Sequence, residues 1–118
     1  TDGGALEVHC RVSCPPLVSP CCYGIDMTTL DEFVAAKYVR MGMNTEQLTE
    51  AVRQEIGADT LCYQTLDALF RSIGLGPDGL CYACLSGNYP TPWGERVLRR
   101  AEQRLGTAAP GRTYEDMG

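Results

Sequence analysis

Hydrophobic and polar residues alternate strictly over LEVHCRVS at residues 6–13. A side-chain period of two is typical of a β-strand with one buried face, here the face that carries the even-numbered residues. Cys14-Pro15-Pro16 ends this strand, because proline cannot donate to a strand ladder. His9 is the only histidine, and on the polar face of the strand it is best interpreted as structural.

Further along the chain, apolar residues recur at helical spacing between capping and breaking residues. These signals predict four helices and one more strand. The first helix is capped by Thr28 or Thr29 and fades before Gly42, and the second has the capping box Asn44 and Gln47 and ends at Gly57. A strand over 60–64 follows. The third helix is capped by Thr65 and stopped by Gly74, and the fourth is a charged helix over 93–105.

Seven cysteines in 118 residues, with no secretion signal, argue against a disulfide framework. The number is odd, and the cytosol keeps thiols reduced. A metal or cluster role is the better interpretation for some of these cysteines. Cys10 and Cys62 stand inside apolar segments, so we expect these two to be small buried packing residues.

A C-x-x-C pair, Cys81 and Cys84, stands between the turn sequences GPDG at 76–79 and SGN at 86–88. We expect a loop here that wraps around a metal centre, and the pair supplies half of a four-ligand site. A thioredoxin-like redox pair fits poorly, because no helix is predicted to open at this motif after a strand. The absence of a second C-x-x-C weakens a zinc-ribbon interpretation.

The vicinal cysteines Cys21 and Cys22 lie in a second proline- and glycine-bounded loop. Adjacent side chains in extended backbone point apart, so one of the two is a candidate ligand and the other a packing residue. With Cys81 and Cys84 this gives three thiolates and leaves a fourth position unfilled. The residues alone leave zinc and a [4Fe–4S] cluster both open.

Composition limits the function classes further. The chain is 44% hydrophobic and 21% charged, with a net charge of −5 and a pI near 4.7, so neither nucleic acid nor an anionic membrane is an expected partner. No apolar run reaches membrane-spanning length. The basic residues of the last predicted helix are best interpreted as a solvated face. No phosphate loop, acidic pair for magnesium or Ser/His/Asp set is present, and no catalytic residue is assigned.

Four blocks of this sequence together resemble the amidophosphoribosyltransferase family: EVHCRVSCPP at 7–16, PCCYGIDM at 20–27, IGADTL at 56–61 and CYACLSGNYP at 81–90. The resemblance covers residues 5 to about 92. It implies an α/β fold in which residues 1–92 form the C-terminal part of a type I phosphoribosyltransferase domain, with the end of a parallel sheet and a helical covering segment. Residues 93–118 would be a C-terminal helix and a loose tail.

The family makes 5-phosphoribosylamine from phosphoribosylpyrophosphate and glutamine, the first committed step of purine biosynthesis. The resemblance implies a cytoplasmic enzyme, usually a tetramer, with a glutaminase domain and bound Mg²⁺. The glutaminase domain, the substrate loop and the magnesium ligands have no counterpart in this sequence. The chain starts at Thr1 without an initiator Met and close to a strand, which predicts truncation. We therefore expect no activity from the chain alone.

The resemblance also implies a [4Fe–4S] cluster with a structural role. Cys21, Cys81 and Cys84 match three of the family's cluster ligands, and the fourth family ligand lies upstream of this sequence. Cys14 and Cys22 depart from the family pattern, so either could replace the missing ligand. Two rival interpretations remain: a small Cys-ligated metal-binding or regulatory module without catalysis, and a binding domain whose basic helix contacts phosphate.

Overall fold

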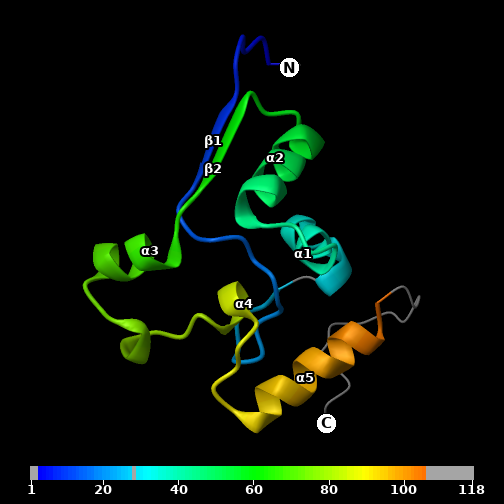
Figure 1. Cartoon of the computed structure of the whole chain (residues 1–118), viewed down its shortest axis with the longest axis vertical. Coiled ribbons are helices and arrows are strands. Elements are labelled where there is room, and N and C mark those ends of the chain that lie inside the picture. Colours follow the sequence, from blue (N-terminus) through cyan, green and yellow to red (C-terminus); the bar gives the residue numbers. More distant parts are fainter. Residues whose placement is uncertain (1–2, 28, 106–118) are drawn as a thin grey trace.

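The structure is a computed structural model that describes residues 3–27 and 29–105 (Figure 1). Two strands and five α-helices, with two short 3-10 helices, make up this part of the chain. In order they are β1 (His9–Val12), η1 (Leu30–Glu32), α1 (Val34–Arg40), α2 (Thr45–Ile56), β2 (Thr60–Tyr63), α3 (Leu66–Ile73), η2 (Pro77–Gly79), α4 (Ala83–Ser86) and α5 (Pro92–Gln103).

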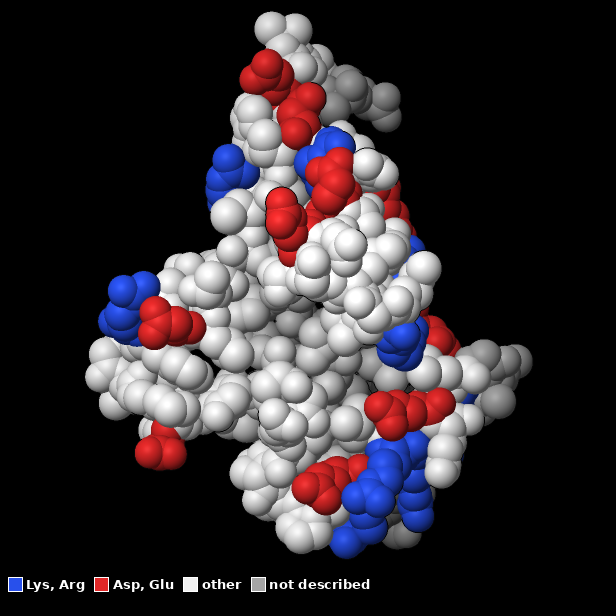
Figure 2. Space-filling view, viewed as in Figure 1, with Lys and Arg blue, Asp and Glu red and all other residues white. Residues whose placement is uncertain are grey.

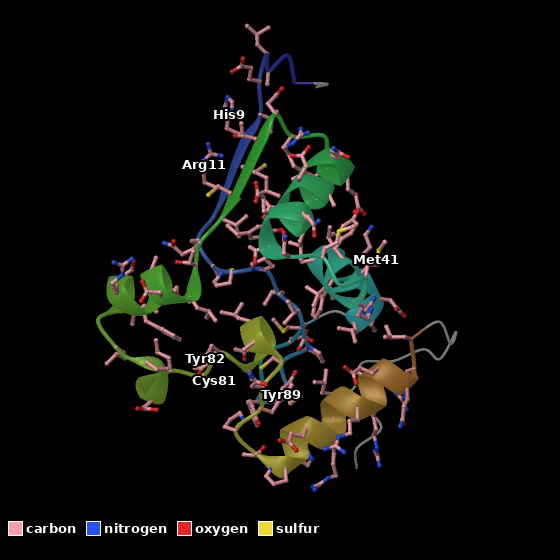
Figure 3. All side chains as sticks on the ribbon, in the orientation of Figure 1. His9, Arg11, Met41, Cys81, Tyr82 and Tyr89 are labelled. Carbon is pink, nitrogen blue, oxygen red and sulfur yellow. The ribbon has the colours of Figure 1, made fainter. Side chains whose placement is uncertain are left out.

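The strands β1 and β2 pair in parallel, from His9 opposite Thr60 to Val12 opposite Tyr63. The helices α1 and α2 form the crossover between them and pack on one side of the two-stranded ribbon (Figure 1). Parallel strands joined through helices confirm the predicted α/β class. His9 and Arg11 project from the side opposite α2 (Figure 3).

The first strand is shorter than the predicted span of 6–13. The Asp59 backbone N–H donates to the Val8 carbonyl at 2.9 Å, and the Asp59 carboxylate accepts from the Val8 N–H at 2.7 Å. These bonds close the ladder at its N-terminal end, because β2 begins only at Thr60. Leu6, predicted to lie on the buried face, is 99% exposed.

The capping signals place most helix ends correctly. The Asn44 side chain accepts from the Gln47 N–H at 2.9 Å, and Gly57 ends α2 with a φ of 68°. Thr65 caps α3, which is followed by Gly74 at a φ of 79°. The charged helix begins one residue before the predicted start, at Pro92, with Thr91 as its cap.

The first predicted helix is divided in two. Thr29 forms a capping box with Glu32 across η1, and α1 begins only at Val34, because Phe33 has an extended backbone with a ψ of 106°. Leu30 and Phe33 both pack into a buried cluster that includes Ala101 of α5. Tertiary packing outweighs helix propensity at this point. Thr28, the alternative cap, lies outside the described residues, as does the tail from residue 106.

Among the described residues, most buried apolar side chains belong to three small clusters. One, containing Leu48 and Val52, fills the space between α1, α2 and β2, and a second joins η1 and α1 to α5. The third consists of Cys22, Ala83, Tyr89 and Val97, so it packs α4 and α5 against the loop that carries the vicinal cysteines. The helix α5 therefore holds two separate parts of the chain together.

The prediction that Cys10 and Cys62 are buried is wrong for Cys62. Cys10 is half-buried, but Cys62 is exposed. It pairs with Arg11 and alternates with Leu61 and Tyr63, which pack toward α2. Cys62 therefore lies on the same exposed face of the ribbon as its partner Arg11. No helix within residues 3–27 and 29–105 has the length and hydrophobicity needed to cross a membrane.

Candidate metal centre

Two backbone hydrogen bonds join the segments that carry the candidate ligands. The Cys84 carbonyl accepts from the N–H groups of Val18 and Ser19, at 2.9 and 3.1 Å. The loop that leads to Cys21 is thereby fixed against α4, although more than sixty residues separate the two in sequence. The Cys21 loop and the C-x-x-C motif are therefore neighbours in space.

A second set of contacts holds the vicinal cysteines from the side of α5. The buried Tyr89 hydroxyl donates to the Pro20 carbonyl, and Tyr89 lies between α4 and α5 in Figure 3. The Cys22 side chain is 8% exposed, and its thiol lies 3.9 Å from the carbonyl oxygens of both Pro20 and Gly94. Cys22 is therefore a packing residue in the described structure.

Gly94 is required by the close approach of two tyrosines. A Cβ at this position would lie 2.4 Å from the Tyr23 hydroxyl oxygen and 2.9 Å from the Tyr89 Cβ. The Tyr23 hydroxyl also bonds with the Thr91 hydroxyl at 2.8 Å, and Thr91 caps α5. The start of α5 is thus fitted closely to the segment that follows Cys21.

The predicted loop at the C-x-x-C motif is wrong for Cys84, which lies inside the short helix α4. Ser86 N–H donates to the Tyr82 carbonyl at 3.1 Å, and Gly87 N–H donates to the Ala83 carbonyl at 2.7 Å. Gly87 then ends the helix with a φ of 77°. The predicted turn after Cys84 is therefore present, and it is the C-terminal end of a helical turn.

The candidate ligands differ in exposure and surroundings. Cys81 precedes α4 and is exposed, whereas Cys21 and Cys84 are half-buried. The Cys21 sulfur accepts from the Tyr23 N–H at 3.4 Å, and the Cys21 N–H donates to the Met27 sulfur at 3.1 Å. These contacts fix the Cys21 loop while leaving the Cys81 side chain open to solvent.

Burial raises the pKa of the Cys84 thiol, and the charge of Cys21 raises it further, with smaller effects from Cys81 and Cys14. Burial also raises the pKa of Cys22. A raised pKa favours the neutral Cys84 thiol, so a metal that took this sulfur as a ligand would have to displace its proton.

The donor set suits a thiophilic metal, since soft thiolates select zinc and iron–sulfur centres. Within residues 3–27 and 29–105, however, no three Cys, His, Asp or Glu side chains already stand at metal-binding separations. The segments that carry Cys21 and Cys84 are neighbours, and the cysteine sulfurs would have to move closer together to bind one ion. The residues therefore fit a metal centre in the chemistry of their side chains and in the proximity of the segments that carry Cys21 and Cys84.

Sequence reasoning missed the residues that position this site. Tyr89 and Gly94 carry no charge and match no metal-binding motif. One signal was available, because a glycine inside a capped amphipathic helix costs about 1 kcal/mol relative to alanine and usually has a packing reason. Gly94 is such a glycine, third in α5.

No family model matches the chain. Its sequence is 42% identical over 91 residues to the amidophosphoribosyltransferase of Methanothermobacter thermautotrophicus, covering 77% of this chain and 17% of that protein. The Bacillus subtilis amidophosphoribosyltransferase is 42% identical over 94 residues, with coverages of 76% and 18%. The Mycobacterium leprae amidophosphoribosyltransferase is 38% identical over 119 residues, with coverages of 98% and 21%.

The parallel strands, their helical crossover and the covering helices are consistent with part of an α/β domain of the phosphoribosyltransferase class. The chain spans 17 to 21% of the length of these three relatives. It belongs to the amidophosphoribosyltransferase family.

Proposed function

We propose that this chain is the C-terminal part of the phosphoribosyltransferase domain of an amidophosphoribosyltransferase. The complete enzyme would make 5-phosphoribosylamine from phosphoribosylpyrophosphate and glutamine with Mg²⁺, in the cytoplasm and as a homotetramer. The observation that carries this proposal is the match over 98% of the chain to the Mycobacterium leprae relative. The chain itself supplies structure to that domain, and its substrate loop, magnesium ligands and ammonia source belong to other parts of the enzyme.

Within this enzyme, Cys21, Cys81 and Cys84 would hold a [4Fe–4S] cluster, with a fourth ligand from elsewhere in the complete protein. When bound by these cysteines, the cluster would cross-link the Cys21 loop to α4. The hydrogen bonds from Val18 and Ser19 to the Cys84 carbonyl support this assignment. They hold the two cysteine-bearing segments together without metal, so less chain entropy is lost when the ligands close around it.

The activity is tested by comparing two proteins in one assay. The longer gene product that carries this sequence is incubated with phosphoribosylpyrophosphate, glutamine and Mg²⁺, and the 118-residue chain is incubated in parallel. We expect pyrophosphate release and 5-phosphoribosylamine from the longer protein only. Formation of 5-phosphoribosylamine by the 118-residue chain, or no reaction by the longer protein, would contradict the proposal.

A further inference from the structure

An open cavity of about 610 Å³ lies at the C-terminal ends of the two strands. Its walls come from the segment after β1 and from the helices α1, α2, α3 and α4, which contribute Pro15, Val39, Leu48, Leu66 and Leu85. In Figure 1 these helices surround the middle of the view, and Figure 2 shows no charged side chain there. Among the described residues, no charged side chain lines the cavity. The cavity therefore favours an uncharged occupant.

Four polar side chains that line the cavity already bond to nearby backbone groups. The Asn44 and Thr65 side chains cap α2 and α3. The Thr49 hydroxyl donates to the Thr45 carbonyl at 2.7 Å, and the Gln64 side-chain oxygen accepts from the Thr65 N–H at 3.2 Å. A small-molecule site needs a few polar groups that converge on the ligand, whereas these groups are engaged at helix ends and turns. The lining therefore suits apolar side chains better than a polar small molecule.

The apolar lining residues are left over from the core. Val39, Leu66 and Leu85 belong to none of the three buried clusters among the described residues. Val39 is 41% exposed, and the two leucines are half-buried. Protein interiors are close-packed and contain few voids, so an apolar cavity of this size indicates that another segment packs into it.

The source of that segment follows from how much polypeptide lies outside this chain. The chain spans 17 to 21% of the length of the three relatives compared above. Parallel sheets occur with both faces covered, whereas α1 and α2 pack on one side of the ribbon (Figure 1). Further elements of the same polypeptide are therefore expected beside these strands, whose C-terminal ends open into the cavity.

We propose that this cavity seats an uncharged apolar segment of the same polypeptide, contributed from outside residues 1–118. The inference rests on the chain being part of a longer family member, and it does not depend on the catalytic activity or on the cluster. Val39, Leu66 and Leu85 would contact aliphatic or aromatic side chains of the added segment. That segment would join α1, α3 and α4 through one shared apolar contact.

Site-specific photo-cross-linking in the longer gene product tests this inference. The photoreactive residue p-benzoylphenylalanine replaces Val39 or Thr45, which both line the cavity and are exposed enough to accept a larger side chain. Met41 and Glu46 are the matched control positions, because both are exposed and neither lines the cavity. After irradiation, digestion and mass spectrometry identify the peptides joined to each position. We expect positions 39 and 45 to capture a peptide from outside residues 1–118, and positions 41 and 46 to capture none.

Other occupants give different products. A cross-link that doubles the mass on denaturing electrophoresis would assign the cavity to a second copy and overturn the inference. A cross-link to residues 106–118 would overturn it as well. So would the absence of any cross-link at positions 39 and 45 in a protein whose circular dichroism is unchanged, because an open cavity or a small apolar ligand would then remain. Capture of the expected peptide without formation of 5-phosphoribosylamine would refute the proposed activity and leave this inference standing.

A pair of charged variants in the longer gene product gives a second readout. Val39→Asp places a carboxylate in the proposed contact, so it should lower the thermal-unfolding midpoint. Met41→Asp should lower the midpoint far less, because Met41 is 68% exposed and lies outside the cavity. Val39→Ile, which keeps an apolar side chain, should stay close to the wild type. Equal shifts for the two aspartate variants would contradict the inference.

Discussion

Gly94 and Tyr89 meet at the point where α5 contacts the loop that carries Cys21. A Cβ on Gly94 would lie 2.8 Å from the Tyr89 ring and 2.9 Å from the Tyr89 Cβ. Tyr89 is only 7% exposed, so it cannot turn aside into solvent. Glycine at position 94 and the Tyr89 hydroxyl together determine how closely α5 approaches the loop that carries Cys21.

Gly94→Ala should therefore lower the free energy of unfolding. Overpacking in a core costs about 1–3 kcal/mol, which exceeds the roughly 1 kcal/mol that alanine gains over glycine in a helix. The urea-unfolding midpoint measures the change. Gly76→Ala is the matched control, because no heavy atom lies within 4 Å of a Cβ there. A Gly94→Ala protein as stable as the wild type would contradict the packing described here.

Tyr89→Phe should cost about 1–3 kcal/mol, because it leaves the buried Pro20 carbonyl without its donor. Tyr23→Phe removes a hydroxyl whose bond to Thr91 is exposed, so its loss should be smaller. Chemical denaturation of the two variants and the wild type gives the comparison. Equal losses for the two tyrosines would show that the Tyr89 hydroxyl has no special part in holding the Cys21 loop.

At the scale of elements, α2 is the helix whose ends are most fully specified by local signals. The capping box between Asn44 and Gln47, the glycine at position 57 and the apolar positions Leu48 and Val52 all agree. Asn44→Ala should lower stability by about 1 kcal/mol, whereas Asn44→Ser should stay close to the wild type, because serine also caps helices well. Thermal unfolding followed by far-UV circular dichroism tests this. Similar losses in both variants would argue against the cap.

The acid sensitivity of α2 should depend on Glu50. The Arg53 guanidinium donates two bonds to the Glu50 carboxylate, at 2.6 and 2.7 Å, and the Gln54 amide donates a third at 2.8 Å. The hydrogen bonds from Arg53, followed by that from Gln54, lower the pKa of Glu50 from 4.5 to about 2. A lowered carboxyl pKa stabilises the folded state above the unfolded value, and this contribution is lost as the pH falls from about 4.5 to about 2.

Glu50→Gln should remove that part of the acid dependence, so its stability should change less than the wild type's over this pH range. Unfolding curves at several pH values measure the difference. A wild-type profile in Glu50→Gln would mean that the contacts with Arg53 and Gln54 do not favour the folded state.

Local signals predicted which elements form better than how they pack. Thr65 and Gly74 predicted both ends of α3, yet no residue of this helix is buried within the described structure, and its Ile73 is 50% exposed. The apolar spacing indicates a helix with a packing face, but it does not say what covers that face. At Phe33 tertiary packing changes the element itself. Its packing in the cluster with Ala101 of α5 interrupts a helix that local propensity favours.

The site was only partly predictable for the same reason. The spacing of Cys81 and Cys84 and the turn around Cys21 indicated candidate ligands. The hydrogen bonds to the Cys84 carbonyl join segments far apart in sequence, and no local pattern encodes them. The exposure of Cys62 also depends on which face of the ribbon packs against the helices. A short apolar run does not indicate which face that is.

For the whole molecule, charge and burial are unevenly distributed. Figure 2 shows charged side chains mainly around the edge of the viewed face, with an uncharged region in the middle. Within the part of the chain that the structure describes, the core is divided into three small clusters rather than one. Two of these clusters include residues of α5. The packing of the interior therefore depends on contacts between α5, the last described helix, and residues 22–36 near the start of the chain.

The central claim is that Cys21, Cys81 and Cys84 hold a [4Fe–4S] cluster in an amidophosphoribosyltransferase. It is tested most directly by the iron and sulfide content of the longer gene product after anaerobic purification. Electron paramagnetic resonance of the reduced protein identifies the cluster type. We predict four iron and four sulfide per chain in the wild type and in Cys62→Ser, and loss of the cluster in Cys21→Ser, Cys81→Ser and Cys84→Ser. Full cluster content in all three of these variants, or none in the wild type, would contradict the account.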